Sequence, residues 1–222
     1  VWFGALTLVL AILCLPLRAL PRRGAVRLGW VWSRATLWGL KTFAGLDMRV
    51  TGTPPTGPVL VAAKHMSMWD TLALHIALGD PGIVLKRELL SIPFYGWYLG
   101  KAAAIAIERS AGAKALRQMM EAARTVLDEG RPVLIFPEGT RNMTDEALLR
   151  FRSGIYNLAL ARPDVELVPC WIENMSRVLP KGAMLPVPLL CRVIFGAPVQ
   201  LGAGEDRKEL LARSRQSLLD IQ

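Results

Sequence analysis

The segment PVLVAAKHMSMWDTLALHIAL, residues 58–78, decides the fold class of this chain. Its first part, residues 59–63, is a short apolar run, which is typical of a fully buried strand. Its second part, residues 69–78, is long and apolar enough for a helix, and Ser67 followed three residues later by Asp70 is a capping-box pattern. A buried strand that leads directly into a helix is the repeating unit of a parallel α/β sheet.

The same alternation continues along the chain. Further strands are predicted at residues 83–86, 103–107, 133–136, 165–168 and 189–195, and further helices at residues 94–100, 113–129, 154–161 and 205–221. We therefore predict an α/β fold with a largely parallel sheet flanked by helices. Proline and glycine crowd residues 51–58, so we divide the chain into an N-terminal segment, residues 1–50, and an α/β domain, residues 51–222.

The N-terminal segment has the composition of a membrane-binding element. It contains seven Lys and Arg residues against one acid, Asp47, and therefore +6 of the net charge of +9, together with four of the seven tryptophans. Residues 1–17 are uncharged and arginines follow them, which indicates an anchor whose C-terminal side is cytoplasmic. Residues 28–45 mix Trp, Arg and Leu, as in an interfacial helix, although a helix packed on the domain has the same pattern. We expect the inner (cytoplasmic) membrane as the location, with the α/β domain on its cytoplasmic side.

The positive charge favours an anionic partner, which is a membrane surface, a phosphorylated substrate or a nucleic acid. The chain has neither paired zinc ligands nor an aromatic RNA-binding strand pattern, so no nucleic-acid partner is expected. Its three scattered cysteines and two histidines also give no zinc-ligand spacing. Residues 96–101 are one residue short of a phosphate-binding loop, and there is no Gly-x-Ser-x-Gly nucleophile elbow.

Ionisable residues follow four of the predicted strands. His65 follows the first strand, Lys86 ends the second, Arg109 follows the third, and Pro-Glu-Gly-Thr-Arg at 137–141 follows the fourth. Parallel strands present their carboxyl ends at one edge of the sheet, where ligands bind. We therefore expect these residues to converge on one site.

His65 and Asp70 are the candidate catalytic pair. A carboxylate in the first helical turn can accept a hydrogen bond from one imidazole nitrogen and leave the other as a general base. Such a base suits a hydroxyl that attacks an activated acyl carbonyl. Alternatively, Asp70 only caps the helix and His65 is an ordinary loop residue. His75 and Asp80 have the same spacing, but the first lies inside the helix and the second in a turn, so we expect no catalytic role for them.

The segment Phe-Pro-Glu-Gly-Thr-Arg, residues 136–141, fits recognition of a phosphorylated polyol. Arg141 would bind phosphate in fork geometry, assisted by Thr140 and by backbone N–H groups near Gly139. Glu138 would accept a hydrogen bond from a glycerol hydroxyl or orient Arg141. Lys86 and Arg109 are further candidate phosphate ligands. The alternative is a surface turn with a chance charge pair and solvated cations.

With Lys-Arg-Glu-Leu-Leu-Ser-Ile-Pro-Phe-Tyr-Gly at 86–96, Ile-Glu-Arg at 107–109 and Val-Pro-Cys at 168–170, these motifs resemble the 1-acyl-sn-glycerol-3-phosphate acyltransferase family over about residues 59–170. The resemblance implies that His65 is the general base on the glycerol 2-hydroxyl and that Asp70 orients it. It implies an acceptor site formed by Lys86, Arg109, Glu138, Gly139, Thr140 and Arg141. It also implies lysophosphatidic acid as acceptor, an acyl thioester on acyl carrier protein or coenzyme A as donor, and neither a metal nor a cofactor.

Three residues depart from that family's pattern. Lys64 stands where the family has Asn, and Met68 and Trp69 stand where it has smaller or aliphatic residues. Acylation of another lyso-lipid, such as a lyso-ornithine lipid, is therefore an alternative. A membrane-bound thioesterase and a non-catalytic lipid-binding protein are alternatives from other classes. Residues 89–107, rich in Leu, Ala and Gly, either line an acyl-chain slot or form ordinary helix–sheet packing.

Overall fold

The computed structural model describes residues 2–13, 21–92, 95–108, 112–142, 148–178, 187–202 and 204–222. In this part of the chain, seven strands form one sheet in the order β1-β7-β6-β2-β5-β3-β4. The strands are β1 (Asp47–Thr51), β2 (Leu60–Ala63), β3 (Gly82–Lys86), β4 (Ile105–Ile107), β5 (Val133–Ile135), β6 (Leu167–Glu173) and β7 (Leu190–Phe195). Neighbouring strands run parallel except β6 and β7, so the prediction of a largely parallel sheet is confirmed.

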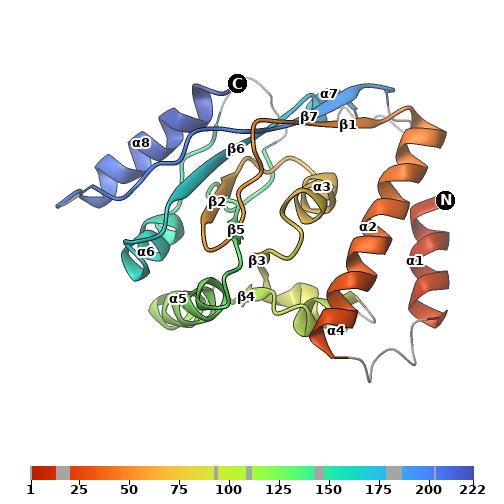
Figure 1. The fold of residues 1–222 in the computed structure, drawn as a ribbon, viewed down its shortest axis with the longest axis horizontal. Coiled ribbons are helices and arrows are strands. Elements are labelled where there is room, and N and C mark those ends of the chain that lie inside the picture. Colours follow the sequence, from red (N-terminus) through yellow and green to blue (C-terminus); the bar gives the residue numbers. More distant parts are fainter. Residues whose placement is uncertain are drawn as a thin grey trace.

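Helices cover both faces of the sheet (Figure 1). On one face lie α5 (Gly112–Asp128), α6 (Gly154–Ala161) and α8 (Arg207–Leu219). On the other face lie α2 (Arg22–Ala44) and α3 (Met68–Leu78). The remaining helices are α1 (Trp2–Leu13), the 3₁₀ helix η2 (Arg87–Ser91), α4 (Tyr95–Lys101) and α7 (Met175–Val178).

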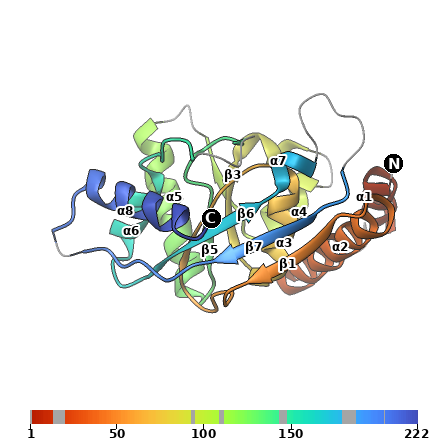
Figure 2. The ribbon, with the colours of Figure 1, turned by 90° about the horizontal axis from the view of Figure 1, so that it is seen from above.

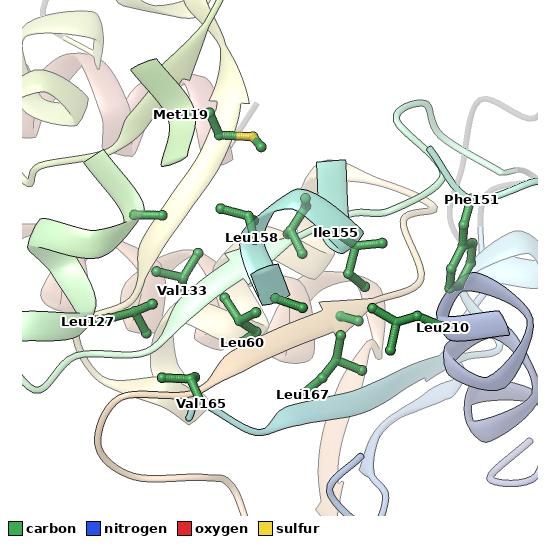
Figure 3. Close-up of a cluster of buried hydrophobic side chains, with 14 of the residues drawn as sticks. Leu60, Met119, Leu127, Val133, Phe151, Ile155, Leu158, Val165, Leu167 and Leu210 are labelled. Atoms are coloured by element: carbon green, nitrogen blue, oxygen red, sulfur yellow. The ribbon is translucent and has the colours of Figure 1, made fainter. Parts of the chain in front are cut away.

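Strand β2 lies in the middle of the sheet, and all four of its residues are buried. Successive side chains of a strand point to opposite faces. Leu60 and Ala62 accordingly pack into the cluster beneath α5, α6 and α8 (Figure 3), whereas Val61 and Ala63 pack into the cluster against α3. Full burial of a large aliphatic side chain stabilises a fold by about 1.5–3 kcal/mol. The strand end that leads to His65 is therefore held firmly from both faces.

Helix α3 begins as the sequence predicts. Ser67 is its N-cap and accepts a hydrogen bond from Trp69 N at 3.0 Å. Asp70 accepts in return from Ser67 N at 2.7 Å, which completes the capping box. The cap fixes the direction in which the chain enters α3, so it also fixes the loop of residues 64–66.

Helices α1 and α2 lie side by side at one end of the molecule (Figure 2). Trp32 Nε1 of α2 donates a hydrogen bond to Thr7 Oγ1 of α1 at 3.1 Å. Helix α2 also buries a row of small residues, and a Cβ atom added to Gly29 would lie only 1.6 Å from Tyr98 Oη. At the start of α2, Arg22 Nη2 donates to both carboxylate oxygens of Asp80 at 2.7 Å. The α2 helix is therefore packed on the domain along one face.

The structure bears on the expected domain division and on the expected N-terminal anchor. Strand β1 begins at Asp47 and pairs with β7, so the expected division at residue 51 cuts through a strand of the main sheet. This strand is only half-buried and has a mixed composition, which hid it from the apolar pattern. Within the described residues, the structure contains no helix that is both long and apolar enough to cross a bilayer. Residues 14–20, part of the stretch considered as an anchor, lie outside the described residues.

Candidate active site

The strands that precede the candidate residues are neighbours in the sheet. Strands β2, β5, β3 and β4 lie in this order and are parallel, so their carboxyl ends meet at one edge. The predicted convergence of these four strand ends is confirmed. Arg109, the candidate that follows β4, lies outside the described residues.

A cavity of about 1110 Å³ opens at this edge of the sheet. Its polar lining contains most of the predicted residues, namely His65, Lys86, Gly139, Thr140 and Arg141. Its apolar lining comes from η2, α4, β4 and α5, and includes Leu89, Leu99, Ile107 and Leu116. Thr7 and Trp32 of the N-terminal helices line it as well. The same cavity therefore joins an ionisable region to a long apolar one.

Asp70 holds His65 in one orientation. The Asp70 side chain is completely buried, and its Oδ2 lies 3.1 Å from His65 Nδ1. The same oxygen accepts from Met66 N at 2.5 Å and from Ser67 N at 2.7 Å. Because a carboxylate only accepts, Nδ1 is the donor and Nε2 keeps the lone pair of a base. Asp70 thus serves both roles that the sequence offered as alternatives, because it caps α3 and also binds the imidazole.

Phe136 supports the imidazole from a second side. The rings of His65 and Phe136 stack with centroids 4.1 Å apart and an interplanar angle of 25°. Sequence reasoning gave Phe136 no role beyond the start of its motif. With Asp70 on Nδ1 and Phe136 on the ring face, the His65 side chain has little freedom to turn. A base that is already oriented avoids the entropic cost of alignment during the reaction.

Glu138 does not take the place predicted for it. Its side chain is buried, and in the described structure it is not among the residues that line the cavity. Its Oε2 accepts from Asn142 Nδ2 at 2.9 Å and from Leu149 N at 2.8 Å, and its Oε1 accepts a longer bond from His65 N at 3.4 Å. The chain reverses at Gly139, where φ is 70°, and this turn directs Glu138 inward. The prediction that Glu138 contacts substrate or orients Arg141 is replaced by a structural role.

The Glu138 contacts lock the two motifs together. Asn142 N donates to His65 O at 2.6 Å, so residue 142 bonds both to the His65 backbone and to the Glu138 carboxylate. The loop that carries His65 and the turn that carries Arg141 are therefore one hydrogen-bonded unit. Such a unit keeps the His65 loop and the Arg141 turn at a fixed separation.

Three described cations lie at the cavity. Lys86 Nζ forms an exposed ion pair with Glu88 at 2.9 Å, and such pairs contribute little stability and exchange readily. Arg141 and Arg152 are exposed and form no ion pair within the described parts of the chain. Sequence reasoning missed Arg152. The available signal was a cation immediately before a helix, where the helix dipole disfavours positive charge.

The second His–Asp pair lies elsewhere. His75 is on α3, and neither it nor Asp80 belongs to the described lining of the cavity. Burial lowers the pKa of His75, and the nearby Asp80 opposes that shift more weakly. Asp80 binds Arg22 and also Arg131, whose Nη2 lies 3.0 Å from Asp80 Oδ1. This aspartate therefore fastens α2 to the domain.

Metal ligation has no candidate in the described residues, where no group of three or more His, Cys, Asp or Glu side chains comes together. Cys170 and Cys191 are buried thiols, and burial raises the pKa of the Cys170 thiol. Both cysteines act as small core residues.

Three comparisons bear on what the site does. A family model described as Acyltransferase matches residues 47–173. A Pseudomonas aeruginosa protein named 1-acyl-sn-glycerol-3-phosphate acyltransferase is 34% identical over 176 residues, which cover 78% of this chain and 67% of the relative. The mouse protein named 1-acyl-sn-glycerol-3-phosphate acyltransferase alpha is 33% identical over 227 residues, covering 99% of this chain and 78% of the relative. The crystal structure of a Thermotoga maritima protein titled 1-acyl-sn-glycerophosphate (LPA) acyltransferase, PlsC, has the same fold, with a TM-score of 0.70 at 22% identity over 90% of this chain and 79% of that chain. This chain is an enzyme that belongs to the acyltransferase family.

Proposed function

We propose that this acyltransferase transfers an acyl chain from an acyl thioester to the sn-2 hydroxyl of 1-acyl-glycerol-3-phosphate, which gives phosphatidic acid. One observation carries the proposal: a single cavity is lined by an oriented histidine, by two arginines that form no ion pair within the described residues, and by many apolar side chains. These features match the hydroxyl, the phosphate and the acyl chains of the reactants. The names of the Pseudomonas and mouse relatives support the same acceptor.

The reaction proceeds by direct transfer. His65 Nε2 removes the proton from the acceptor hydroxyl as its oxygen attacks the thioester carbonyl, and Asp70 stabilises the imidazolium that forms. The new C–O bond forms as the C–S bond breaks. The proton on Nε2 then passes to the departing sulfur, so a thiol leaves and His65 returns to its neutral form. No step requires an acyl-enzyme, a metal or a cofactor.

The acceptor phosphate binds at the cationic part of the cavity. Arg141 offers a planar fork of donors that matches two phosphate oxygens. Lys86 adds a point charge after it exchanges Glu88 for the substrate. Thr140 and the backbone near Gly139 line the same region and supply neutral donors. Arg109 remains a proposed ligand.

The acyl chain occupies the apolar part of the cavity. Leu89, Leu99 and Ile107, which lie in the predicted slot segment, line this part, whereas the Gly and Ala residues of that segment are not in the described lining. The test is Leu89→Trp, because a larger side chain should shift the preference toward shorter acyl chains. Leu90→Trp is the matched control, since this neighbour is half-buried but is not part of the described lining. An unchanged chain-length profile in Leu89→Trp would count against this assignment.

We also propose that α1 and α2 rest on the cytoplasmic side of the inner membrane. Among the described residues, their large exposed apolar side chains are Leu8, Val9, Val31, Trp38 and Phe43. Trp38 and Phe43 are 56% and 66% exposed, which is unfavourable in water and suits the interface of a bilayer. Because Thr7 and Trp32 on the same helices line the cavity, a lipid acceptor has a short route to the site. Loss of vesicle binding in Trp38→Glu with Phe43→Glu would support this placement, and unchanged binding would contradict it.

The three residues that depart from the family pattern lie beside His65 and Asp70, and their positions bear on which acceptor the enzyme uses. Lys64 is fully buried, with Nζ 4.2 Å from the centroid of the Trp171 ring, and Trp69 is buried in the core. Met68, 40% exposed, is the one of these three in the described lining of the cavity. Two of the three departures therefore act on packing, which weakens the case for a phosphate-free acceptor such as a lyso-ornithine lipid.

A panel of acceptors tests the proposal. The full chain is given one acyl thioester, on coenzyme A or on acyl carrier protein, with lysophosphatidate, a lyso-ornithine lipid or no lipid. Phosphatidic acid formed only with lysophosphatidate supports the proposal. Preferred acylation of the lyso-ornithine lipid would favour the alternative acceptor, and free fatty acid released without any lipid would favour a thioesterase.

A further inference from the structure

Arg152 lies on the wall of the cavity that His65 lines, although none of the motifs quoted above contains it. It lines the same cavity as His65 and Arg141, and its side chain is exposed. In the described residues its guanidinium forms no ion pair or hydrogen bond with the protein. An arginine at this position can therefore bind an anionic ligand without first giving up a protein partner.

The backbone holds Arg152 at a fixed place relative to Arg141. Arg152 N donates to Pro137 O at 2.7 Å, and Pro137 begins the turn that leads to Arg141. The preceding residue, Phe151, is buried in the core and prevents the segment from sliding. The backbone segments that carry the two arginines are therefore held together, and this lowers the entropic cost of binding one ligand with both guanidinium groups.

The position of Arg152 is electrostatically unfavourable in the absence of an anion. It stands two residues before Gly154, the first residue of α6, where the helix dipole is positive. The N-cap Ser153 makes no side-chain cap hydrogen bond, and the first turn of α6 contains no acid. Ser153 and Gly154 also line the cavity, so an anion placed there would meet both the guanidinium and the helix start.

We propose that Arg152 is a specificity-determining residue that binds the acceptor phosphate together with Arg141. The proposal rests on the function proposed above. A phosphate monoester carries a charge of about −1.5 to −2 at pH 7, which two guanidinium groups can balance. An acceptor without phosphate would leave the two arginines uncompensated, so the pair selects against it.

Three variants test the proposal in the full chain. Arg152→Ala removes the guanidinium group, Arg152→Lys keeps the positive charge without the paired N–H donors, and Arg150→Ala is the matched control. Arg150 is exposed and outside the described lining of the cavity. Initial rates are measured with 1-acyl-glycerol-3-phosphate and with 1-acylglycerol, its phosphate-free counterpart. Thermal unfolding of each variant shows whether it is folded.

Arg152→Ala should lower kcat/KM for the phosphate acceptor by about 10- to 100-fold, mainly through KM, because charge-assisted hydrogen bonds are lost. Its rate with 1-acylglycerol should change by less than about 3-fold. Arg152→Lys should fall between Arg152→Ala and the unmodified chain, and Arg150→Ala should match the unmodified chain. If Arg152→Ala does not fold, Arg152→Gln takes its place in the same comparison.

Equal effects of Arg152→Ala and Arg150→Ala on the phosphate acceptor would overturn the inference. An equal loss of kcat/KM with both acceptors would also overturn it, because a side chain that acts by binding phosphate has no such contact with 1-acylglycerol. The unmodified chain is assayed first. If it does not acylate 1-acyl-glycerol-3-phosphate, that result overturns the proposed function and not the inference about Arg152.

Discussion

Replacing Glu138 by Gln distinguishes the structural role found here from direct contact with the acceptor. The Glu138 carboxylate is 2% exposed and accepts from Asn142 Nδ2, Leu149 N and, more weakly, His65 N. A glutamine can keep its oxygen toward the first two donors, and its amide group then faces His65 N, which is also a donor. The variant therefore loses the bond to His65 N and the charge that strengthens the other two.

The magnitude follows from these contacts. Hydrogen bonds to charged groups contribute about 1.5–3 kcal/mol and neutral ones about 1 kcal/mol, so the variant should lose roughly 2 kcal/mol of stability. For a domain of this size that corresponds to a fall in Tm of roughly 4–8 °C. The loop that carries His65 loosens, and because a misplaced catalytic group can cost about 100-fold, kcat should fall by about 10- to 100-fold.

The assay combines thermal unfolding with steady-state kinetics over a range of lysophosphatidate concentrations. We expect lower Tm and lower kcat with KM within about 3-fold of the unmodified chain. Thr140→Val is the matched comparison, since Thr140 lines the cavity and its loss should raise KM at unchanged Tm. A Glu138→Gln variant with normal Tm and kcat but a raised KM would refute the structural role and would support direct contact of Glu138 with the substrate.

Three further predictions follow from the same structure. Asp70→Asn should lower kcat by about 10³- to 10⁴-fold, because the imidazolium loses its carboxylate. Ser67→Ala removes the N-cap and a 3.2 Å hydrogen bond to Asp70 Oδ1 but keeps the Oδ2 contact with His65, so it should cost about 1 kcal/mol of stability and lower kcat far less than Asp70→Asn does. Burial lowers the pKa of His75, so the contribution of His75 to stability is present above its unfolded pKa of about 6.5 and is lost as pH falls through the lower folded value. His75→Gln should therefore reduce the fall in unfolding free energy between about pH 7 and pH 5 and keep turnover within about 2-fold. A large loss of turnover would contradict the assignment of His75 as a residue without a catalytic role. Gly29→Ala should lower Tm, because its Cβ atom would meet Tyr98 Oη and displace α2, at a cost of about 1–3 kcal/mol that a melting curve can detect.

The central strands could be predicted because buried parallel strands are nearly continuous apolar runs. Strands β2 and β5 are wholly buried, and their positions were apparent in the sequence to within a residue or two. The edge strand β1 escaped because it is half-buried and carries Asp47 and Arg49. The choice between an interfacial helix and a packed helix for α2 also depended on information the pattern lacks, because α2 meets α3, and Gly29 meets Tyr98, only in the folded chain.

In the candidate site, too, local contacts could be predicted from the sequence and tertiary contacts could not. The contact of His65 with Asp70 is local, between residues five apart, so spacing and capping rules could predict it. The inward direction of Glu138 depends on the positive φ of Gly139 and on the backbone of Leu149, eleven residues away. The position of Arg152 depends on a backbone hydrogen bond to Pro137, which is fifteen residues away. Such pairings are tertiary and leave little trace in local sequence.

The most direct test of the account is the rate of phosphatidic acid formation by His65→Ala. The chain is purified with and without this substitution and given lysophosphatidate and an acyl thioester under identical conditions. We propose His65, held by Asp70 and Phe136 at the cavity, as the general base, so removal of the imidazole should lower kcat by about 10²- to 10⁴-fold at nearly unchanged Tm. Turnover near that of the unmodified chain would contradict the assignment of His65 as the catalytic base.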